Sequence, residues 1–143
     1  MLNRRGPPMA KIREYGPGDR VYVQAQRIWL ILTGFVSGDP TRPSYGKIRT
    51  MTYGELALRM GYSTSQAGRT LGRQLGIVGR CCLDNNLPAL NSIVVNTTTG
   101  LPGDHVVLTP GNTIKEEQRA VSKWDWYSVG VPTTGMLRKV WET

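Results

Sequence analysis

Hydrophobic residues recur at helical spacing between residues 19 and 36. Asp19 is a residue type that caps helix N-termini, and the apolar positions that follow fall near one helical face: Val21, Ile28, Ile31, Leu32, Phe35 and Val36. The pattern predicts a core helix from Asp19 to about Val36. Residues 37–46 are rich in Gly and Pro and predict a loop, and Lys47 to Met51 predict a short strand.

The segment 52–76 has the pattern of a helix-turn-helix. Thr52 stands three residues before Glu55, the spacing of a capping box in which each side chain binds a backbone N–H of the other residue. A helix is expected to begin there and to stop at Gly61, which can take the left-handed conformation of a helix end. A second helix, capped by Ser63, Thr64 or Ser65, is expected to reach about Gly76. The residues expected at the crossing and in the core are Leu56, Ala57, Met60 and Ala67.

A β-branched run follows the helix-turn-helix and predicts two strands. Residues 91–96 read as the first strand, residues 97–104 as a turn, and residues 105–108 as the returning strand, which together form a wing. A closing helix is expected from Thr113 to Trp126, and then a tail that packs through Trp141.

The expected fold class is therefore α+β, mainly α: a winged helix-turn-helix with a two-stranded wing and an extra N-terminal and C-terminal helix. Residues 1–18 are rich in Pro, Gly and charge and predict a flexible basic arm. Residues 19–143 are expected to form a single winged-helix-like domain with a C-terminal extension.

Composition supports one globular domain. The chain has 143 residues, of which 39% are hydrophobic, and this excludes collagen, full disorder and coiled coil. The longest apolar run, residues 28–32, is far shorter than the roughly 20 residues that cross a bilayer, and no secretory signal is evident. The adjacent cysteines Cys81 and Cys82 fit a reducing compartment. We expect a cytoplasmic protein without a membrane partner, associated with the nucleoid if the source is bacterial.

The charge is concentrated in one part of the chain. The formal net charge is +8, and residues 42–80 hold seven basic side chains against one acidic side chain. Most of these are Arg, the residue that most often contacts phosphate, so double-stranded DNA is the expected partner. The candidate contacts are Lys47 and Arg49 before the helix-turn-helix and, at three- and four-residue spacings in its second helix, Gln66, Arg69, Thr70 and Arg73. A merely solvated basic surface, or an amphipathic hairpin with a wet outer face, is the alternative.

A family resemblance begins at Gly46 and extends to Gly103. Its motifs are Thr52-Tyr53-Gly54-Glu55-Leu56-Ala57, then Gly61, then Ala67-Gly68-Arg69-Thr70-Leu71-Gly72. The segment resembles the DNA-binding domain of O6-alkylguanine-DNA alkyltransferases and alkyltransferase-like proteins. That family is a winged-helix domain that binds the minor groove through its second helix and rotates a damaged guanine out of the stack. The resemblance implies that Tyr53 presses on the phosphate of the rotated nucleotide and that Arg69 fills the vacated space.

The reactive motif of that family is altered in this chain. Where the family has Pro-Cys-His-Arg followed by two valines, this sequence has Leu90-Asn91-Ser92-Ile93-Val94-Val95, so Asn91 stands at the position of the nucleophile. An amide cannot accept an alkyl group, and Ser92 supplies no imidazole base. The resemblance therefore implies a non-enzymatic binding protein, closer to the alkyltransferase-like branch. Its candidate pocket residues are Asn91, Ser92, Gly100 and Gly103.

Other chemistry finds less support in the sequence. Two adjacent cysteines and a lone His105 do not have the spacing of a zinc site, so no metal or cofactor is expected. At least one cysteine is expected to be a small core residue rather than a reactive thiol beside Arg80. Glu116 and Glu117 are expected only to solvate a helix start. The three tryptophans at 124, 126 and 141 are expected to pack in the core rather than to stack on bases.

Three functional hypotheses remain. The first is a non-enzymatic protein that recognises a damaged or distorted base by nucleotide flipping, with repair or regulatory proteins as further partners. The second is a sequence-specific or regulatory winged-helix DNA binder that does not flip a base. The third is an enzyme with a site that the sequence does not reveal.

Overall fold

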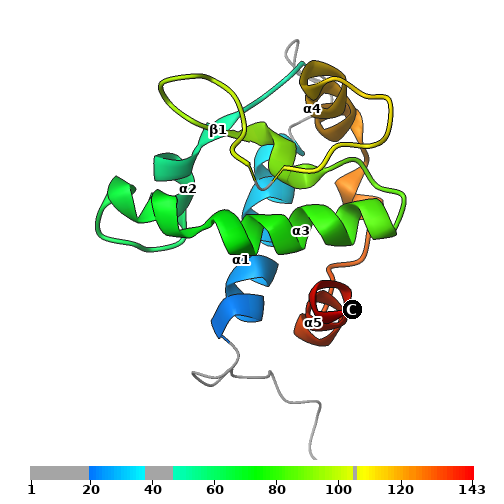
Figure 1. Ribbon diagram of the computed structural model, residues 1–143, viewed down its shortest axis with the longest axis horizontal. Helices are drawn as coiled ribbons and strands as arrows, with labels where there is room; N and C mark the ends of the chain where they lie inside the picture. Colours follow the sequence, from blue (N-terminus) through cyan, green and yellow to red (C-terminus); the bar gives the residue numbers. More distant parts are fainter. Residues whose placement is uncertain (1–19, 38–46, 105) are drawn as a thin grey trace, which may run out of the picture.

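The fold is mainly helical with one small sheet, which confirms the predicted α+β, mainly α class. The structure is a computed structural model that describes residues 20–37, 47–104 and 106–143. The predicted arm, the Asp19 cap, most of the 37–46 loop and His105 lie outside the described residues. Figure 1 shows α3 (Gly72–Asp84) running across the molecule, with α1 (Arg20–Val36) crossing it and α5 (Thr134–Glu142) beside its C-terminal half.

The core forms where α1 packs against α3 and α5. The prediction of a helix to Val36 is confirmed. Its buried side chains recur at three- and four-residue spacings, so they form one apolar stripe: Tyr22, Ala25, Ile28, Trp29, Leu32 and Val36. No helix among the described residues is long and apolar enough to cross a membrane.

The predicted capping box forms as expected at the start of α2 (Tyr53–Arg59). The Glu55 amide donates to Thr52 Oγ1 at 3.1 Å, and the Thr52 amide donates to Glu55 Oε1 at 3.0 Å. The helix ends before Gly61, whose φ of 95° lies in the left-handed region. Leu56, Ala57 and Met60 are buried as predicted.

The second helix of the predicted hairpin is divided in two. A 3-10 helix, η2 (Ser65–Thr70), precedes α3, and Leu71, with φ of −95° and ψ of 0°, separates the two. The expected end near Gly76 is wrong, because α3 continues to Asp84. Gly76 and Gly79 are both buried within this helix. A β-carbon on Gly79 would lie 2.4 Å from the Asn91 amide oxygen, so glycine serves close packing there.

The sheet joins segments that the sequence did not pair. β1 (Met51–Thr52) and β2 (Val94–Val95) are parallel, in the register Met51 to Val94 and Thr52 to Val95. Only the end of the predicted 47–51 strand forms, and η3 (Leu90–Ile93) replaces the start of the predicted 91–96 strand.

The predicted hairpin between residues 91–96 and 105–108 is wrong, since Val106 to Leu108 form no strand. The reason lies in the turn after β2. The Asn96 amide donates to the Leu101 carbonyl at 2.9 Å, and Asn96 Oδ1 accepts from the Thr98 amide at 2.8 Å. The segment thus closes on itself as a loop instead of returning as a strand.

The C-terminal part contains two helices rather than one helix and a tail. The predicted closing helix appears as α4 (Ile114–Lys123), with a capping box at Thr113, and is followed by a short 3-10 turn, η4 (Trp126–Ser128). The helix α5 was not predicted. Trp141 is half-buried against the core as expected. Trp126 is buried, and its ring lies edge-on to Trp29 with 5.7 Å between the ring centres. Trp124 is exposed, which contradicts its predicted place in the core.

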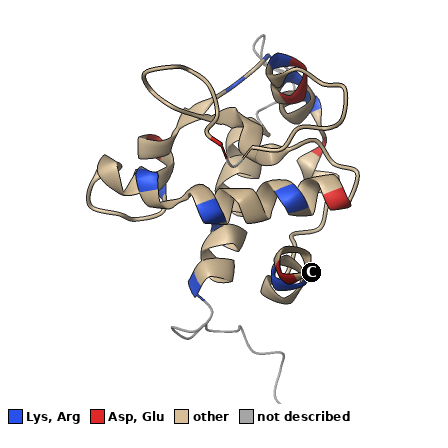
Figure 2. Ribbon diagram, viewed as in Figure 1, with Lys and Arg blue, Asp and Glu red and all other residues tan. Residues whose placement is uncertain are grey.

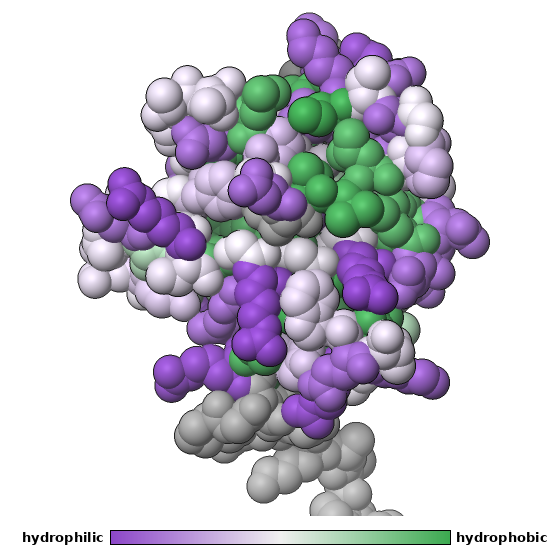
Figure 3. Space-filling model, viewed as in Figure 1, coloured by the Kyte–Doolittle hydropathy of each residue, from purple (hydrophilic) through white to green (hydrophobic). Residues whose placement is uncertain are grey.

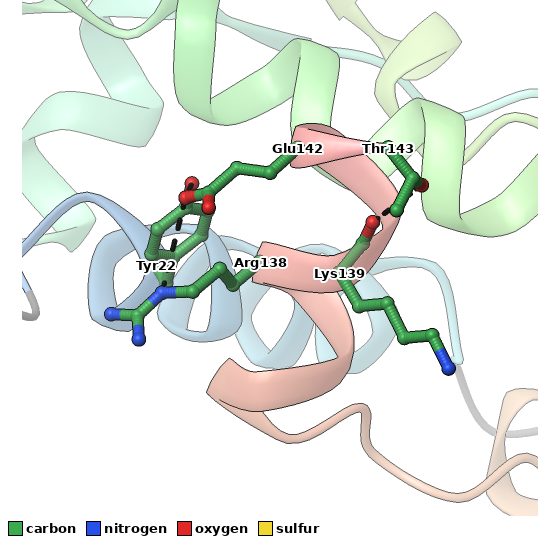
Figure 4. A network of polar contacts seen from close by, with 5 residues as sticks. All are labelled: Tyr22, Arg138, Lys139, Glu142 and Thr143. Carbon is green, nitrogen blue, oxygen red and sulfur yellow. Dashed lines mark hydrogen bonds and ion pairs between the residues drawn. The ribbon is translucent and has the colours of Figure 1, made fainter.

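Polar contacts attach α5 to α1. Figure 4 shows Tyr22 of α1 pointing toward Glu142 of α5, to which its hydroxyl donates a hydrogen bond. The Arg138 guanidinium lies 5.1 Å from the Tyr22 ring centre and 3.9 Å from the Glu142 carboxylate. Arg138 and Glu142, one turn apart on α5, thus contact the face and the hydroxyl of Tyr22.

Glu117 corrects another expectation, because it is fully buried rather than solvated. Its carboxylate accepts from the Ala89 amide at 2.6 Å, the Thr109 amide at 3.1 Å, the Thr109 hydroxyl at 2.8 Å and Asn112 Nδ2 at 2.9 Å. Burial alone would raise the pKa of Glu117, but these hydrogen bonds together hold it below its usual value. Glu117 therefore fixes the 109–112 loop against the chain before η3. Glu116 is exposed at the helix start as predicted, but its carboxylate also accepts from the Thr113 amide at 2.8 Å in the capping box, so it does more than solvate the helix.

Hydrophobic side chains also gather at the surface between α3 and α4, where Figure 3 shows a green area. A shallow cavity of about 330 Å³ lies there. Its apolar lining comes from the end of α3 and from α4 and its flanks: Leu83, Leu87, Pro88, Pro110, Ala120 and Trp124.

Candidate nucleic-acid interface

An open groove of about 680 Å³ separates the α2–η2 hairpin from the loop that follows β2. Tyr53 and its neighbours at the start of α2 contribute to it. One wall comes from η2 and the start of α3, and the other wall comes from residues 96–98 and Gly103. The groove therefore lies over the capped start of α2, where the sequence predicted a binding surface.

The η2 wall depends on the tight period of the 3-10 helix. Gln66, Arg69 and Gly72 are spaced by three residues and all line the groove. A 3-10 helix has three residues per turn, so side chains at this spacing lie above one another. Arg69 and Gln66 thereby line the same wall of the groove.

Two glycines bring η2 and α2 into direct contact. A β-carbon on Gly54 would lie 2.9 Å from the Ser65 β-carbon, and one on Gly68 would lie 2.5 Å from the Tyr53 carbonyl oxygen. Only glycine permits backbones to approach this closely. Because Arg69 is the residue after Gly68, it lies close to Tyr53, and both residues line one groove.

Tyr53 connects the two walls. Its side chain is half-buried, and its hydroxyl accepts a hydrogen bond from the Gly103 amide at 2.6 Å. The pKa of Tyr53 is raised, chiefly by burial of the side chain. The hydrogen bond from Gly103 lowers this pKa, and the charge of Asp104 raises it further. Tyr53 therefore stays a neutral phenol near neutral pH and holds the 96–103 loop to the start of α2.

The loop wall consists of short polar side chains. Asn96 Oδ1 accepts from the Thr98 amide, which orients Thr97 and Thr98 along the groove. Of the described residues that line the groove, Arg69 is the cation and Glu55 the acid. The hydrogen bond from the Thr52 amide lowers the pKa of Glu55, so this carboxylate remains charged at the groove edge. Residues 96–98 were not among the predicted contacts, although an Asn-Thr-Thr sequence is typical of a turn.

The structure brings together only part of the predicted contact set. Gln66 and Arg69 line the groove, whereas Thr70 and Arg73 are exposed elsewhere. The Thr70 hydroxyl donates to the Ala67 carbonyl at 2.7 Å. The prediction that all four share a face assumed a continuous α-helix, and the 3-10 period with the break at Leu71 moves Thr70 and Arg73 off it.

Lys47 and Arg49 also lie outside the groove lining. Arg49 Nη1 donates to the Phe35 carbonyl at 2.6 Å, and its guanidinium lies 4.4 Å from the Phe35 ring centre. The Arg59 guanidinium lies 5.2 Å from the same ring centre. Both arginines therefore contact Phe35 near the C-terminal end of α1, and neither lines the groove. Figure 2 shows the wider distribution, with basic positions along α3 and on the hairpin and both signs of charge on α4.

Asn91, the expected pocket residue, is buried rather than open to the groove. Asn91 and Ser92 are fully buried, with the Asn91 amide against Gly79 and the Ser92 carbonyl bonded by Gln118 Nε2 at 2.9 Å. Gly103 lines the groove as predicted, but Gly100 only forms the left-handed turn of the loop, with φ of 70°. The cavity thus lies beside Tyr53 and Arg69, and the surroundings of Asn91 are closed.

Neither the possible metal ligands nor the thiols of the described residues form a reactive site. Among the residues described, no three His, Cys, Asp or Glu side chains come together as metal ligands would. Cys81 and Cys82 are free and buried, which confirms that they are small core residues. Burial raises the pKa of both thiols, so neither resembles an activated nucleophile.

Comparison with protein-family models, with curated proteins and with solved structures gives no match to this chain. The function proposed below therefore rests on the residues of the groove and on their geometry.

Proposed function

We propose that this protein binds double-stranded DNA through the groove between the α2–η2 hairpin and the 96–103 loop, and that it recognises a damaged or distorted base without chemistry. The observation that carries the proposal is the placement of Arg69 and Tyr53 in one open groove of about 680 Å³. This volume lies within the usual range of ligand sites, roughly 300–1,000 Å³. A groove of this kind has room for a base that has left the stack.

Arg69 has the chemistry that base rotation requires. Its side chain is exposed at the groove, and a planar guanidinium can stack on neighbouring bases and hydrogen-bond an orphaned partner base. Taking a base out of the stack costs a few kcal/mol, so such compensation is needed. The Gln66 amide and the hydroxyls of Thr97 and Thr98 supply donors and acceptors for the edge of the rotated base.

The closed surroundings of Asn91 support binding rather than alkyl transfer. Because Asn91 and Ser92 are fully buried, no substrate atom can reach them in this conformation. A winged-helix classification of the domain belongs to the same proposal, with the 96–103 loop in the role of the wing. Repair or regulatory proteins would then act on the DNA that this protein presents, and a cytoplasmic or nucleoid location follows from such a role.

A second candidate is a DNA binder that does not rotate a base. It is favoured by the hydrogen bond from the Gly103 amide to the Tyr53 hydroxyl, because that hydroxyl already has a structural role. In this case the groove accepts the intact duplex, and Arg69 contacts a phosphate.

Duplex binding with and without O6-methylguanine tests both candidates. We expect affinity to fall steeply with salt, because displaced counterions oppose binding, and we expect tighter binding to the lesion. Arg69→Ala should then reduce the lesion preference more than the affinity for intact DNA. Arg119→Ala on α4 is the matched control and should change neither.

The outcomes separate the candidates. Equal loss by Arg69→Ala on damaged and intact duplexes would identify a phosphate contact and support the second candidate. Absence of duplex binding by the wild-type protein at low salt would contradict both.

A further inference from the structure

A second, smaller cleft lies on the other side of the turn that follows α2. Its volume is about 230 Å³. α1 contributes Arg20, Gln24 and Arg27, and the turn contributes residues 60–62. Of the described residues that line the cleft, two are arginines and none is acidic, so this lining has the charge of an anion site.

The sequence of α1 explains why these three side chains face the cleft together. Positions 20, 24 and 27 are separated by four and three residues and therefore lie on one helical face. The buried stripe of α1, which includes Ala25 and Ile28, lies on a different face of the same helix. The cleft face of α1 is thus available to a ligand while the helix stays anchored in the core.

Hydrogen bonds hold the cleft in shape. Arg27 Nη2 donates to the Met60 carbonyl at 2.7 Å, and Gln24 Nε2 donates to the Tyr62 hydroxyl at 3.1 Å. Gln74 of α3 donates in turn to Gln24 Oε1 at 2.6 Å. A guanidinium has five N–H donors, so the bond to Met60 orients Arg27 and leaves others for a ligand. The cleft is therefore organised before any ligand arrives.

The cleft and the groove are separated only by one turn of the chain. Tyr62 lines the cleft and Ser65 lines the groove. Three residues of extended chain reach at most about 11 Å, which is comparable to the roughly 6–12 Å width of the grooves of B-DNA. One duplex lying across the turn can therefore touch both places at once.

We infer that the cleft of Arg20 and Arg27 is a phosphate-binding site, which takes a backbone phosphate of the same DNA duplex that the groove binds. The inference rests on the proposed function and extends it to a surface of α1 that the sequence analysis did not include. Its ligand is a phosphodiester, recognised by guanidinium donors and by charge, without reading the base sequence.

The test is the salt dependence of duplex binding by Arg20→Gln and by Arg20→Gln combined with Arg27→Gln. Loss of one phosphate contact lowers the slope of log K against log salt by about one unit, and we expect roughly tenfold weaker binding at moderate salt. The loss should be the same for intact and O6-methylguanine duplexes, since a phosphate contact carries no base information. Arg27→Lys keeps the charge and should keep the slope.

Two further measurements make the result decisive. Arg119→Gln removes the same charge from α4, which does not line the cleft, and should leave the slope unchanged. Arg20 lies at the exposed start of α1, so Arg20→Gln should keep the wild-type melting temperature even if the double variant does not.

Failure of the inference is distinct from failure of the proposed function. If the wild-type protein binds DNA and both Arg20→Gln and the double variant of Arg20→Gln with Arg27→Gln match its affinity and slope, the inference is overturned and the proposed function stands. An equal effect of Arg119→Gln overturns it as well, because the charge would then act non-specifically. If the wild-type protein shows no salt-dependent duplex binding, the proposed function itself is overturned.

Discussion

Gly68 lies directly against the backbone of Tyr53, so that a β-carbon on Gly68 would be 2.5 Å from the Tyr53 carbonyl oxygen and 2.6 Å from its carbonyl carbon. These neighbours are backbone atoms and cannot turn aside. We therefore expect Gly68→Ala to destabilise the protein by about 1–3 kcal/mol, the usual range for an overpacked contact. The change in the urea midpoint, with unchanged m, measures it.

Gly72→Ala is the control for this prediction. A β-carbon on Gly72 meets nothing within 4 Å, and the residue begins α3. Alanine there should be neutral or stabilising by up to about 1 kcal/mol, because glycine is a poor helix residue. Similar destabilisation by both variants would show that the Tyr53 contact is not the cause.

Tyr53→Phe should loosen the 96–103 loop. The change removes the acceptor of the Gly103 amide, so we expect a stability loss of about 1 kcal/mol and faster hydrogen exchange at Gly103. Tyr127→Phe serves as the control, because the Tyr127 side chain is 82% exposed. Unchanged exchange at Gly103 in Tyr53→Phe would mean that the loop is held by other contacts.

Glu117→Gln should change the dependence of stability on pH. The folded-state pKa of Glu117 lies below its ordinary value of 4.5, so protonation opposes folding. The stability from this group is complete above the ordinary carboxyl pKa and is lost as the pH falls through the lower folded value. Glutamine places an amide donor among groups that donate to the carboxylate, and we expect a loss of about 2–3 kcal/mol at pH 7.

The pH series for Glu117→Gln has a clear signature. The difference in unfolding free energy between wild type and variant should shrink as the pH falls below about 5 toward 3. Asp125→Asn, which changes an exposed carboxylate, is the control and should keep the wild-type profile. A constant difference between wild type and Glu117→Gln across this range would contradict the lowered pKa.

Both cysteines should resist a thiol reagent in the native protein. Cys81 is 2% exposed and Cys82 is 0% exposed, and burial raises the pKa of each thiol. Labelling at mildly alkaline pH should therefore be limited by opening of the structure and become fast in urea. Rapid labelling of either thiol under native conditions would restore the hypothesis of a reactive site.

The elements that the sequence predicted well are those with local signals. The predicted capping box at Thr52 depends on residues three positions apart, and it forms. The same spacing forms a second capping box at Thr113, which the sequence analysis did not predict. The 3-10 form of η2 depends on the contact between Gly68 and Tyr53, which arises only when the chain folds back. Likewise, β2 pairs with β1 rather than with the next β-branched run, and no local pattern distinguishes these choices.

The candidate site was predictable to a similar degree. Tyr53, Gln66, Arg69 and Gly103 line the groove as their positions suggested. Arg73 lies outside the groove lining because η2 and α3 do not form the continuous α-helix that the prediction assumed. The error at Asn91 follows from burial, because an aligned motif gives a position in the chain but not the depth of a side chain beneath the surface.

The contact between Tyr22 and Glu142 spans 120 positions of the chain. At a synthesis rate of roughly 5–20 residues per second, Tyr22 is added to the chain about 6–24 s before Glu142. Throughout that interval the side of α1 that α5 will cover has no permanent partner. The contact that attaches α5 to α1 therefore cannot form until residue 142 has been added, however early α1 itself becomes helical.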